Sequence, residues 1–419
     1  MTLTFLTPLQ TPLEGGRVFC FTTLAGGDSR EGRSRIGNDL IFNLLPSPAV
    51  RVNAEMAKRT GLLGAVVQDQ TTGQWEIRWG KLVQADGGAL FLDGVQGFPE
   101  ESMSQLREFL SERKAEIYKA ASALRNARVR IVMAGNSPQP AGLYFTRLQA
   151  VRNTGTQDKI IFSERPDWLR VHIPLCFVEG DVSYNDRNLS LIGSEKIVRT
   201  IPADVFKKLV MDIWRRTLDD FVLDPPVKSR AVLLIEEWQK EYPKIDLAVL
   251  KGEALLIILH LCYAVASLKY RVNEQDKILV TVEDLDFVRE LLEFYFTRHG
   301  LEKEAKNEQW LDTTAKKISD ITDPVWGTIT HEQAKAYETF SLAMVALYET
   351  GGRMKAEELC ARCGITRRPF FQRKAITEDL ITERFGKVPE IFESATGLGI
   401  KLSQFGMRIA KCIYQRPRL

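Results

Sequence analysis

The sequence predicts an α/β domain with a mainly parallel sheet, followed by an all-helical segment and a small C-terminal domain. Three observations carry this prediction. Strand-like and helix-like patterns alternate over the first two-thirds of the 419 residues, the pattern is wholly helical from about 201 to 300, and a polar stretch then precedes a last amphipathic region. A chain of this length can form two or three domains with a large core.

The composition is that of an ordinary globular protein, with 44% hydrophobic and 26% charged residues. No apolar run is long enough to span a membrane, and the first residues lack the regions of a signal peptide. We therefore expect a protein without a membrane partner that is cytoplasmic, in an archaeal, bacterial or viral-host cell, or nuclear. Cys360 and Cys363 form one C-x-x-C pair, but no second pair stands at zinc spacing, which favours two helix cysteines.

Four apolar runs are expected to form the strands of the sheet. They are residues 17–27, 89–92, 127–138 and 171–181. Between them, residues 37–47 and 100–117 have helical spacing, and the second stretch places Met103, Leu106, Phe109 and Leu110 on one face. Two of the strands end on short polar residues, Asp93 and Asn136. Taken alone, the first could be a strand-end cap and the second a turn residue before Ser-Pro.

A glycine-rich loop, AGGDSREGRSRIGND at residues 25–39, follows the first strand. A phosphate loop needs glycines, so that backbone N–H groups can face the phosphates, and a lysine that reaches them. Here the lysine is missing. Gly26, Gly27 and Gly32 could still form an anion nest, with Arg33 or Arg35 replacing the lysine, although a guanidinium does not reproduce a point charge. The alternative is an ordinary turn that carries solvated arginines.

The helical segment contains one stretch, residues 252–271, that is apolar nearly all round. This pattern predicts a buried helix. Its His260 is expected to be a core residue with a satisfied hydrogen bond, because no partner for a catalytic triad stands near it in the sequence.

The C-terminal region, residues 330–419, predicts a winged helix-turn-helix domain. An amphipathic helix ends on glycines at residue 352, a short helix and a turn at Gly364 follow, and two β-like runs are expected within residues 399–414. We expect DNA contacts from basic residues at the start of the second helix, and core positions for Phe370 and Phe371. The basic residues are Arg367, Arg368, Arg373 and Lys374. The alternative is a protein-contact module with a solvated basic face.

Residues 61–93, GLLGAVVQDQTTGQWEIRWGKLVQADGGALFLD, resemble the MCM family of AAA+ replicative DNA helicases without a gap. The run GKLVQADGG matches the family's run before its Walker B strand, and TTGQW would form the tip of a β-hairpin inserted in a helix. Residues 116–138 resemble the family's presensor hairpin and first sensor strand. The resemblance implies an AAA+ core over residues 1–200, with inserted hairpins, and a helical lid over 201–315.

The resemblance assigns roles to the nucleotide-site candidates. Asp93 matches the Walker B aspartate, which holds magnesium through water, and Asn136 matches the first sensor. Gly94 stands where the family has its catalytic glutamate, so the general base is absent at this position. Glu100 and Glu101 lie on the far side of the loop VQGFP, and one of them would have to act as the base, through an unusual loop path, if the chain is an active helicase.

Three further basic residues match family positions less closely. Arg170 lies at the place of the arginine finger, although Val171 and His172 depart from the motif. Lys251 lies near the second sensor's arginine, where a lysine keeps the charge and loses bidentate geometry. Lys119, beside Tyr118, lies at the presensor hairpin tip that contacts DNA in the family.

The resemblance implies a degenerate, collarless MCM-like protein of DNA replication that binds DNA and hydrolyses ATP inefficiently or not at all. ATP and magnesium are expected as cofactors only if the altered loop still holds phosphate. Partners would be DNA, other copies of the chain, or an intact MCM ring. One alternative is an active ATP-dependent helicase, which a folded phosphate nest at residues 25–39 would favour. Another is a non-enzymatic partner subunit of an intact ring.

Overall fold

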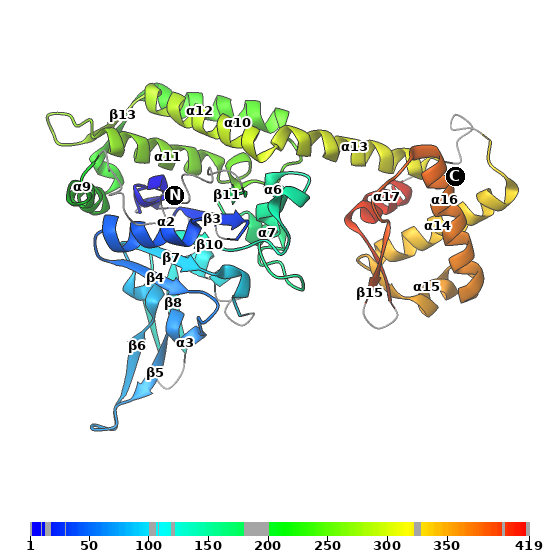
Figure 1. The fold of residues 1–419 in the computed structure, drawn as a ribbon, viewed down its shortest axis with the longest axis horizontal. Coiled ribbons are helices and arrows are strands. Elements are labelled where there is room, and N and C mark those ends of the chain that lie inside the picture. Colours follow the sequence, from blue (N-terminus) through cyan, green and yellow to red (C-terminus); the bar gives the residue numbers. More distant parts are fainter. Residues whose placement is uncertain are drawn as a thin grey trace. The chain divides into compact units, whose positions relative to one another are not determined.

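The computed structural model describes residues 2–9, 11–12, 18–29, 31–99, 106–107, 109–118, 122–179, 201–321, 328–395 and 399–415. The chain forms two compact units, Met1–Ala305 and Lys306–Leu419, each with its own hydrophobic core (Figure 1). The first unit contains both the sheet and the helical layer. The predicted division of this unit at residue 200 stays a prediction.

A five-stranded parallel sheet forms the centre of the first unit, in the order β11-β3-β10-β7-β4. Its strands are β3 (Thr22–Gly27), β4 (Ala49–Asn53), β7 (Ala89–Asp93), β10 (Arg130–Ala134) and β11 (Ile173–Phe177). The predicted α/β architecture is therefore confirmed. The sequence analysis missed β4, because this edge strand is only partly buried and its polar residues interrupt the apolar run.

Residues 89 to 92 of β7 are buried on both faces of the sheet, which explains why they read as one continuous apolar run. Ala89 and Phe91 belong to one hydrophobic cluster, whereas Leu90 and Leu92 belong to another. Gly37 lets a helix lie directly on the sheet, because a Cβ there would stand 2.2 Å from the Phe91 ring.

Helices cover both faces of the sheet (Figure 1). One face carries α1 (Thr2–Phe5), α2 (Arg33–Asp39), the π-helical turn η2 (Leu40–Leu44) and α9 (Ala203–Arg215). The other face packs against α6 (Arg147–Arg152), since a Cβ on Gly26 of β3 would stand 2.6 Å from the Val151 side chain. The helices α10 (Pro225–Glu241), α11 (Ala254–Lys269) and α12 (Val282–His299) form a layer beyond the β11 edge of the sheet (Figure 1). The boundary between the two units falls within α13 (Leu301–Ser319).

Short elements connect these layers. They are β1 (Thr11–Pro12), β2 (Val18–Phe19), α3 (Arg59–Leu62), α4 (Lys81–Gln84), η3 (Val95–Gly97), η4 (Ala141–Leu143), α6 (Arg147–Arg152), α7 (Arg165–Trp168), η5 (Leu218–Asp220), β12 (Phe221–Leu223), η6 (Ala248–Leu250) and β13 (Ile278–Val280). Among the helices of the described ranges, none is long and apolar enough to cross a membrane.

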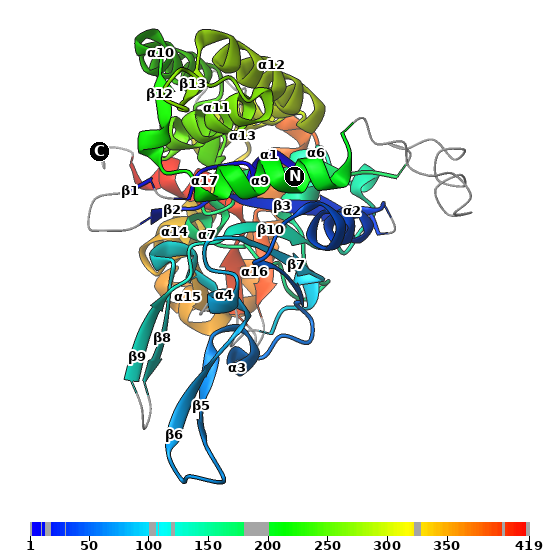
Figure 2. The ribbon, with the colours of Figure 1, turned by 90° about the vertical axis from the view of Figure 1, so that its left-hand side faces the viewer.

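Two β-hairpins project from the same side of the first unit (Figure 2). One pairs β5 (Gly64–Gln68) with β6 (Trp75–Trp79) between α3 and α4, and the other pairs β8 (Lys114–Tyr118) with β9 (Ser122–Asn126). Both inserted hairpins were expected. The expected helix at 100–117 was wrong at its end, because Ala115 and Ile117 are buried at the period of two that is typical of a strand. Met103 lies outside the described residues.

The buried helix predicted at 252–271 is α11, and His260 lies in the core as expected. Its Nδ1 atom is 2.7 Å from the Leu256 carbonyl oxygen, and its ring centroid is 4.4 Å from that of Phe19. Burial, together with smaller effects of the nearby His172 and Arg130, lowers the pKa of His260 to about 3, against the raising effect of the Leu256 carbonyl.

This pKa predicts acid sensitivity of the first unit. His260 stays neutral when folded, whereas an unfolded histidine takes up a proton below about pH 6.5. Its contribution to stability is therefore complete above pH 6.5 and declines as the pH falls toward 3. Between pH 7.5 and 5, we expect it to remove about 2 kcal/mol from the free energy of unfolding. Denaturant titrations of the wild type and of His260→Asn, which can keep the bond to Leu256, check this. Equal pH slopes would contradict it.

The second unit is a helical domain with a small antiparallel sheet. Its elements are α14 (His331–Glu349), β14 (Arg353–Lys355), α15 (Ala356–Arg362), α16 (Arg367–Phe385), β15 (Phe392–Ala395), β16 (Gly399–Leu402) and α17 (Gln404–Tyr414). The strands pair in the order β14-β16-β15. Gly364, with φ of +66°, lies in the turn between α15 and α16.

The expected second β-like run near residue 410 is wrong, because residues 404–414 form α17. Ser403 caps this helix by accepting a hydrogen bond from the Gly406 N–H, and Phe405 and Ile409 are buried at helical spacing. The expectation for Phe371 is also corrected. Phe370 is buried, but Phe371 is 39% exposed, because it points to the other side of α16.

Candidate nucleotide-binding site

The carboxyl ends of the parallel strands bring several candidate residues together. Asp93 ends β7, and Asn136 follows β10 by two residues, so both lie at the same edge of the sheet. A cavity of about 230 Å³ opens there. Its lining residues are Arg33, Ser34, Asn53, Glu55, Asp93, Gly94, Gln96, Ala134, Gly135 and Asn136.

Arg33 places a buried positive charge beside this cavity. Arg33 is only 5% exposed. Its Nη1 donates a hydrogen bond to the Gly26 carbonyl oxygen at 3.1 Å, and its Nη2 donates to Asn136 Oδ1. Burial lowers the pKa of the guanidinium from its ordinary value, against the raising effect of nearby acids. The alternative of solvated arginines therefore fails for Arg33, whereas Arg35 is exposed.

The glycine-rich loop is folded against the ends of neighbouring strands. The Asp28 N–H donates to the Phe177 carbonyl oxygen at 2.8 Å. The Asp28 carboxylate accepts hydrogen bonds from the Ala141 and Glu179 N–H groups at 2.6 and 2.7 Å. The loop ends at Gly32, whose φ of +79° turns the chain into α2.

Ser34 was missed by the sequence analysis, although the signal was present. Gly27 and Gly32 have the spacing of a phosphate loop, and Arg33 and Ser34 then stand where that motif has Lys and Ser or Thr. In the structure, Ser34 Oγ donates to Asp93 Oδ1 at 2.7 Å. A serine hydroxyl beside an aspartate carboxylate is an oxygen ligand set that suits Mg²⁺.

Arg51 of β4 holds the other oxygen of the same carboxylate. Its Nη2 lies 2.6 Å from Asp93 Oδ2, and the Asp93 side chain is 14% exposed. A magnesium ion would compete with this guanidinium for Asp93. Apart from that competition, the residues fit a magnesium nucleotide, because Arg33 and the loop supply positive charge and Ser34 and Asp93 supply oxygen ligands.

Glu55 and Gln96 complete the cavity and were also missed. Gln96 Nε2 donates to Glu55 Oε1 at 2.7 Å, and Gln96 Oε1 accepts from the Asn136 N–H at 3.1 Å. Glu55 follows β4 by two residues, so it could be placed only after β4 had been recognised as a strand.

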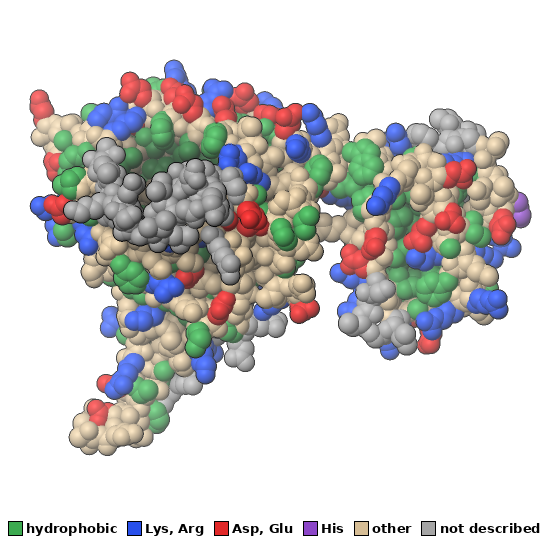
Figure 3. Space-filling view, viewed as in Figure 1, with side chains coloured by type: hydrophobic (Ala, Val, Ile, Leu, Met, Phe, Trp, Pro, Cys, Tyr) green, Lys and Arg blue, Asp and Glu red, His purple; other side chains and the backbone are tan. Residues whose placement is uncertain are grey.

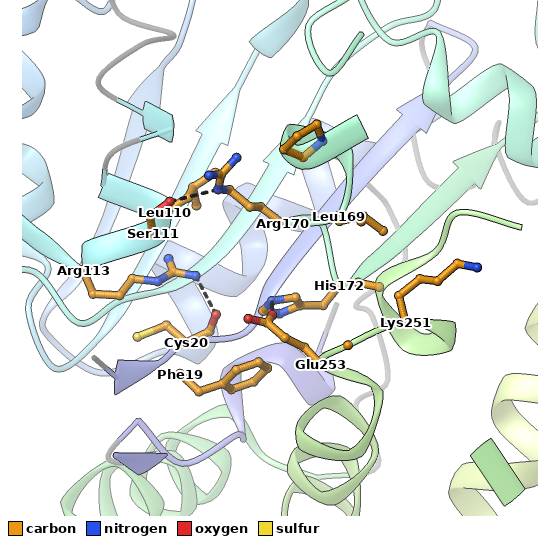
Figure 4. Close-up of a pocket in the computed structure, with 13 residues that line it drawn as sticks. Phe19, Cys20, Leu110, Ser111, Arg113, Leu169, Arg170, His172, Lys251 and Glu253 are labelled. Carbon is orange, nitrogen blue, oxygen red and sulfur yellow. Dashed lines mark hydrogen bonds and ion pairs between the residues drawn. The ribbon is translucent and has the colours of Figure 1, made fainter. Parts of the chain in front are cut away.

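Arg170 and Lys251 line a different cavity, of about 330 Å³ (Figure 4). Arg170 donates to Ser111 Oγ at 3.0 Å and to Asp167 Oδ1 at 2.8 Å. Lys251 extends away from Arg170 and donates to the Pro243 carbonyl oxygen at 3.0 Å.

This second cavity lies at the amino edge of the sheet. His172 of its lining exchanges hydrogen bonds with Thr22, the first residue of β3. A strand of five or six residues spans about 17–20 Å. Arg170 and Lys251 are therefore on the opposite edge from Asp93, and they do not join it within one chain.

The DNA-binding candidates of α16 fall into two groups. Arg367 and Arg368 are exposed. Arg373 donates to Thr339 Oγ1 at 2.9 Å, and Lys374 pairs with Glu378 at 2.9 Å, so both are engaged within the domain. Lys119 lies outside the described residues, as does the side chain of Tyr118. The β5–β6 hairpin is polar rather than basic, and Figure 3 shows mainly uncharged atoms at its tip.

Comparison with known proteins gives a family for part of this chain. The family model described as MCM P-loop domain matches residues 27–164. The chain is 30% identical over 149 residues to the DNA replication licensing factor mcm6 of Schizosaccharomyces pombe, which covers 35% of this chain and 16% of that protein.

Two further relatives show the same partial coverage. The chain is 32% identical over 89 residues to the minichromosome maintenance protein MCM of Saccharolobus solfataricus, covering 21% of this chain and 13% of the relative. It is 26% identical over 167 residues to the zygotic DNA replication licensing factor mcm3 of Xenopus laevis, covering 39% of this chain and 20% of the relative. The matched region thus spans a fifth or less of each relative. Residues 27–164 of this chain are thus similar to the P-loop domain of the MCM family.

Proposed function

We propose that this chain is a DNA-binding AAA+ protein of DNA replication that binds ATP at the carboxyl-edge cavity and hydrolyses it slowly. The observation that carries the proposal is the convergence of Arg33, Ser34, Asp93 and Asn136 on one cavity, within the segment that matches the MCM P-loop domain. Slow hydrolysis is inferred from two substitutions, Arg33 in place of a lysine and Gly94 in place of a glutamate.

The residues of the cavity have distinct proposed roles. The Arg33 guanidinium and the N–H groups of the loop would bind phosphate oxygens, and Asn136 would orient a phosphate or water through its amide. Ser34 and Asp93 would hold a magnesium ion. When bound, that ion would neutralise phosphate charge and so make the phosphorus easier to attack.

Contacts between chains are part of the proposal. Arg170 and Lys251 lie on the opposite edge of the sheet from the cavity, so within this chain they cannot contact a nucleotide held by Asp93. This placement supports an assembly in which the amino edge of one chain faces the cavity of the next, either another copy or a subunit of an intact MCM ring. The second case corresponds to a partner subunit that supplies Arg170.

The active helicase is the second candidate function, and the folded loop favours it. Gly27, Gly32, Arg33 and Ser34 keep the spacing of a phosphate loop, and Asp28 anchors the loop to its neighbours. A measurable rate of strand separation on forked DNA with ATP would select this candidate over the slow ATPase.

We further propose that residues 330–419 form a winged helix-turn-helix domain that binds DNA. The order of its helices and strands supports this, because α15, the turn at Gly364 and α16 are followed by the β15–β16 hairpin. Arg367 and Arg368 would contact phosphates at the start of α16.

Charge reversal of this pair tests the DNA-binding proposal. The double variant Arg367→Glu and Arg368→Glu is expected to weaken binding of duplex DNA about 10-fold or more, and to reduce the salt dependence of the binding constant by about two phosphate contacts. Fluorescence anisotropy at several salt concentrations measures both. Lys316→Glu and Lys335→Glu together make an equal charge change on other helices as the control. Unchanged affinity of the first double variant would contradict the assignment of α16 as the DNA-contacting helix.

A further inference from the structure

We propose that Glu55 is the general base for ATP hydrolysis, in place of the carboxylate that residue 94 lacks. This inference rests on the proposed nucleotide site. It replaces the sequence-based view that hydrolysis would need Glu100 or Glu101, which lie outside the described residues.

The Glu55 side chain occupies the space that a side chain at residue 94 would enter. A Cβ built on Gly94 would stand 3.1 Å from Glu55 Cγ and 3.3 Å from both Cδ and Oε1. A Cβ on Gly97 would stand 2.6 Å from Glu55 Cγ. Both glycines thus leave room for Glu55, and its carboxyl group lies immediately beside the backbone of Gly94.

The parallel pairing of β4 with β7 explains this position. Asn53 is in register with Asp93, and the Ala54 N–H donates to the Asp93 carbonyl oxygen at 2.6 Å. The chain leaving β4 therefore runs beside the chain leaving β7, and the second residue after β4 lies next to the first residue after β7. A carboxylate from the neighbouring strand thereby reaches the same edge as Asp93.

Hydrogen bonds hold one oxygen of the Glu55 carboxylate at the cavity. Gln96 Nε2 donates to Oε1, and Gln96 in turn accepts from the N–H of Asn136, the residue matched to the first sensor. Gln96 is therefore a positioning residue that links Glu55 to Asn136. Glu55 itself is exposed, so water reaches its carboxylate in the cavity.

The proposed step uses water as the second reactant. The water oxygen attacks the γ-phosphorus of ATP and forms a new P–O bond, and Glu55 accepts the proton that the water loses. The bond from the γ-phosphorus to the oxygen of the β-phosphate breaks, and that oxygen keeps the electron pair in ADP. Glu55 then releases its proton to solvent, so the products are ADP, inorganic phosphate and a proton.

Glu55→Gln tests the inference because it keeps the shape and the Gln96 contact but removes the base. We measure ATP affinity by titration calorimetry with magnesium, and single-turnover hydrolysis with radiolabelled ATP from pH 5 to 9. The expected result is an ATP Kd within about 2-fold of the wild-type value and a hydrolysis rate lower by about 100-fold or more. Glu76→Gln, an exposed carboxylate of the β6 strand, is the control and should match the wild type in both measurements.

The outcomes separate this inference from the proposal on which it rests. If the wild type binds ATP and Glu55→Gln hydrolyses it at the wild-type rate, Glu55 is not the base, and the nucleotide site stands. If the wild type binds ATP without hydrolysing it, the inference also fails alone. If the wild type does not bind ATP, both fail.

Discussion

Replacing Arg33 with alanine is expected to weaken ATP binding by about 10- to 100-fold. The guanidinium is the buried positive charge of the cavity and contacts both Gly26 and Asn136, at the place where a phosphate loop presents its lysine. A hydrogen bond to a charged group contributes about 1.5–3 kcal/mol, which corresponds to a change of this size in Kd. Titration calorimetry with ATP and magnesium measures the effect.

Two other variants serve as controls for Arg33→Ala. Arg35→Ala removes an exposed arginine from the same helix and should leave the Kd within about 2-fold of the wild-type value. Arg33→Lys restores the ordinary phosphate-loop residue and should bind ATP at least as well as the wild type. If Arg33→Ala and Arg35→Ala bind ATP equally well, Arg33 is not a phosphate ligand.

Gly27→Ala is expected to destabilise the first unit by about 3 kcal/mol or more. A Cβ at this position would stand 2.1 Å from the Phe177 carbonyl oxygen, so β3 and β11 would have to separate at the end where the loop begins. The φ of +109° adds backbone strain, because residues with a side chain rarely adopt it. Thermal and denaturant unfolding followed by circular dichroism measure the loss.

Gly32→Ala is the matched control for this prediction. Gly32 also has a positive φ, +79°, but a Cβ there would meet no atom within 4 Å. Only the backbone strain remains, and it should cost about 1 kcal/mol. A loss for Gly27→Ala as small as that for Gly32→Ala would show that the β3–β11 contact does not require glycine.

The sequence predicted most of the sheet because burial on both faces makes a strand apolar throughout. β7 and β10 are buried along nearly their full length, and their continuous apolar runs were recognised. β4 is an edge strand in which partly buried residues alternate with exposed ones, so its pattern carried less signal. Near the end of the chain, the sequence pattern did not separate strand from helix, because α17 follows β16 after a single capping residue, Ser403.

The residues of the carboxyl-edge cavity show the same difference between those near recognised strands and those near β4. Asp93 and Asn136 could be predicted because they lie at the ends of strands that the sequence revealed, and Arg33 because it follows the glycine-rich loop after β3. Arg51 and Glu55 could not, since their positions depend on the pairing of β4 with β7, which joins residues about 40 positions apart. The separation of Arg170 from Asp93 likewise required the strand order, because distance along the sequence does not give the edge of the sheet on which a residue lies.

The most direct test of the account is an equilibrium titration of the full chain with ATP, with and without magnesium, for the wild type and Asp93→Ala. We expect the wild type to bind ATP, to bind it about 10-fold more tightly with magnesium, and to lose this magnesium effect in Asp93→Ala. Absence of ATP binding by the wild type, or an equal magnesium effect in both proteins, would contradict a nucleotide site built on Arg33, Ser34 and Asp93.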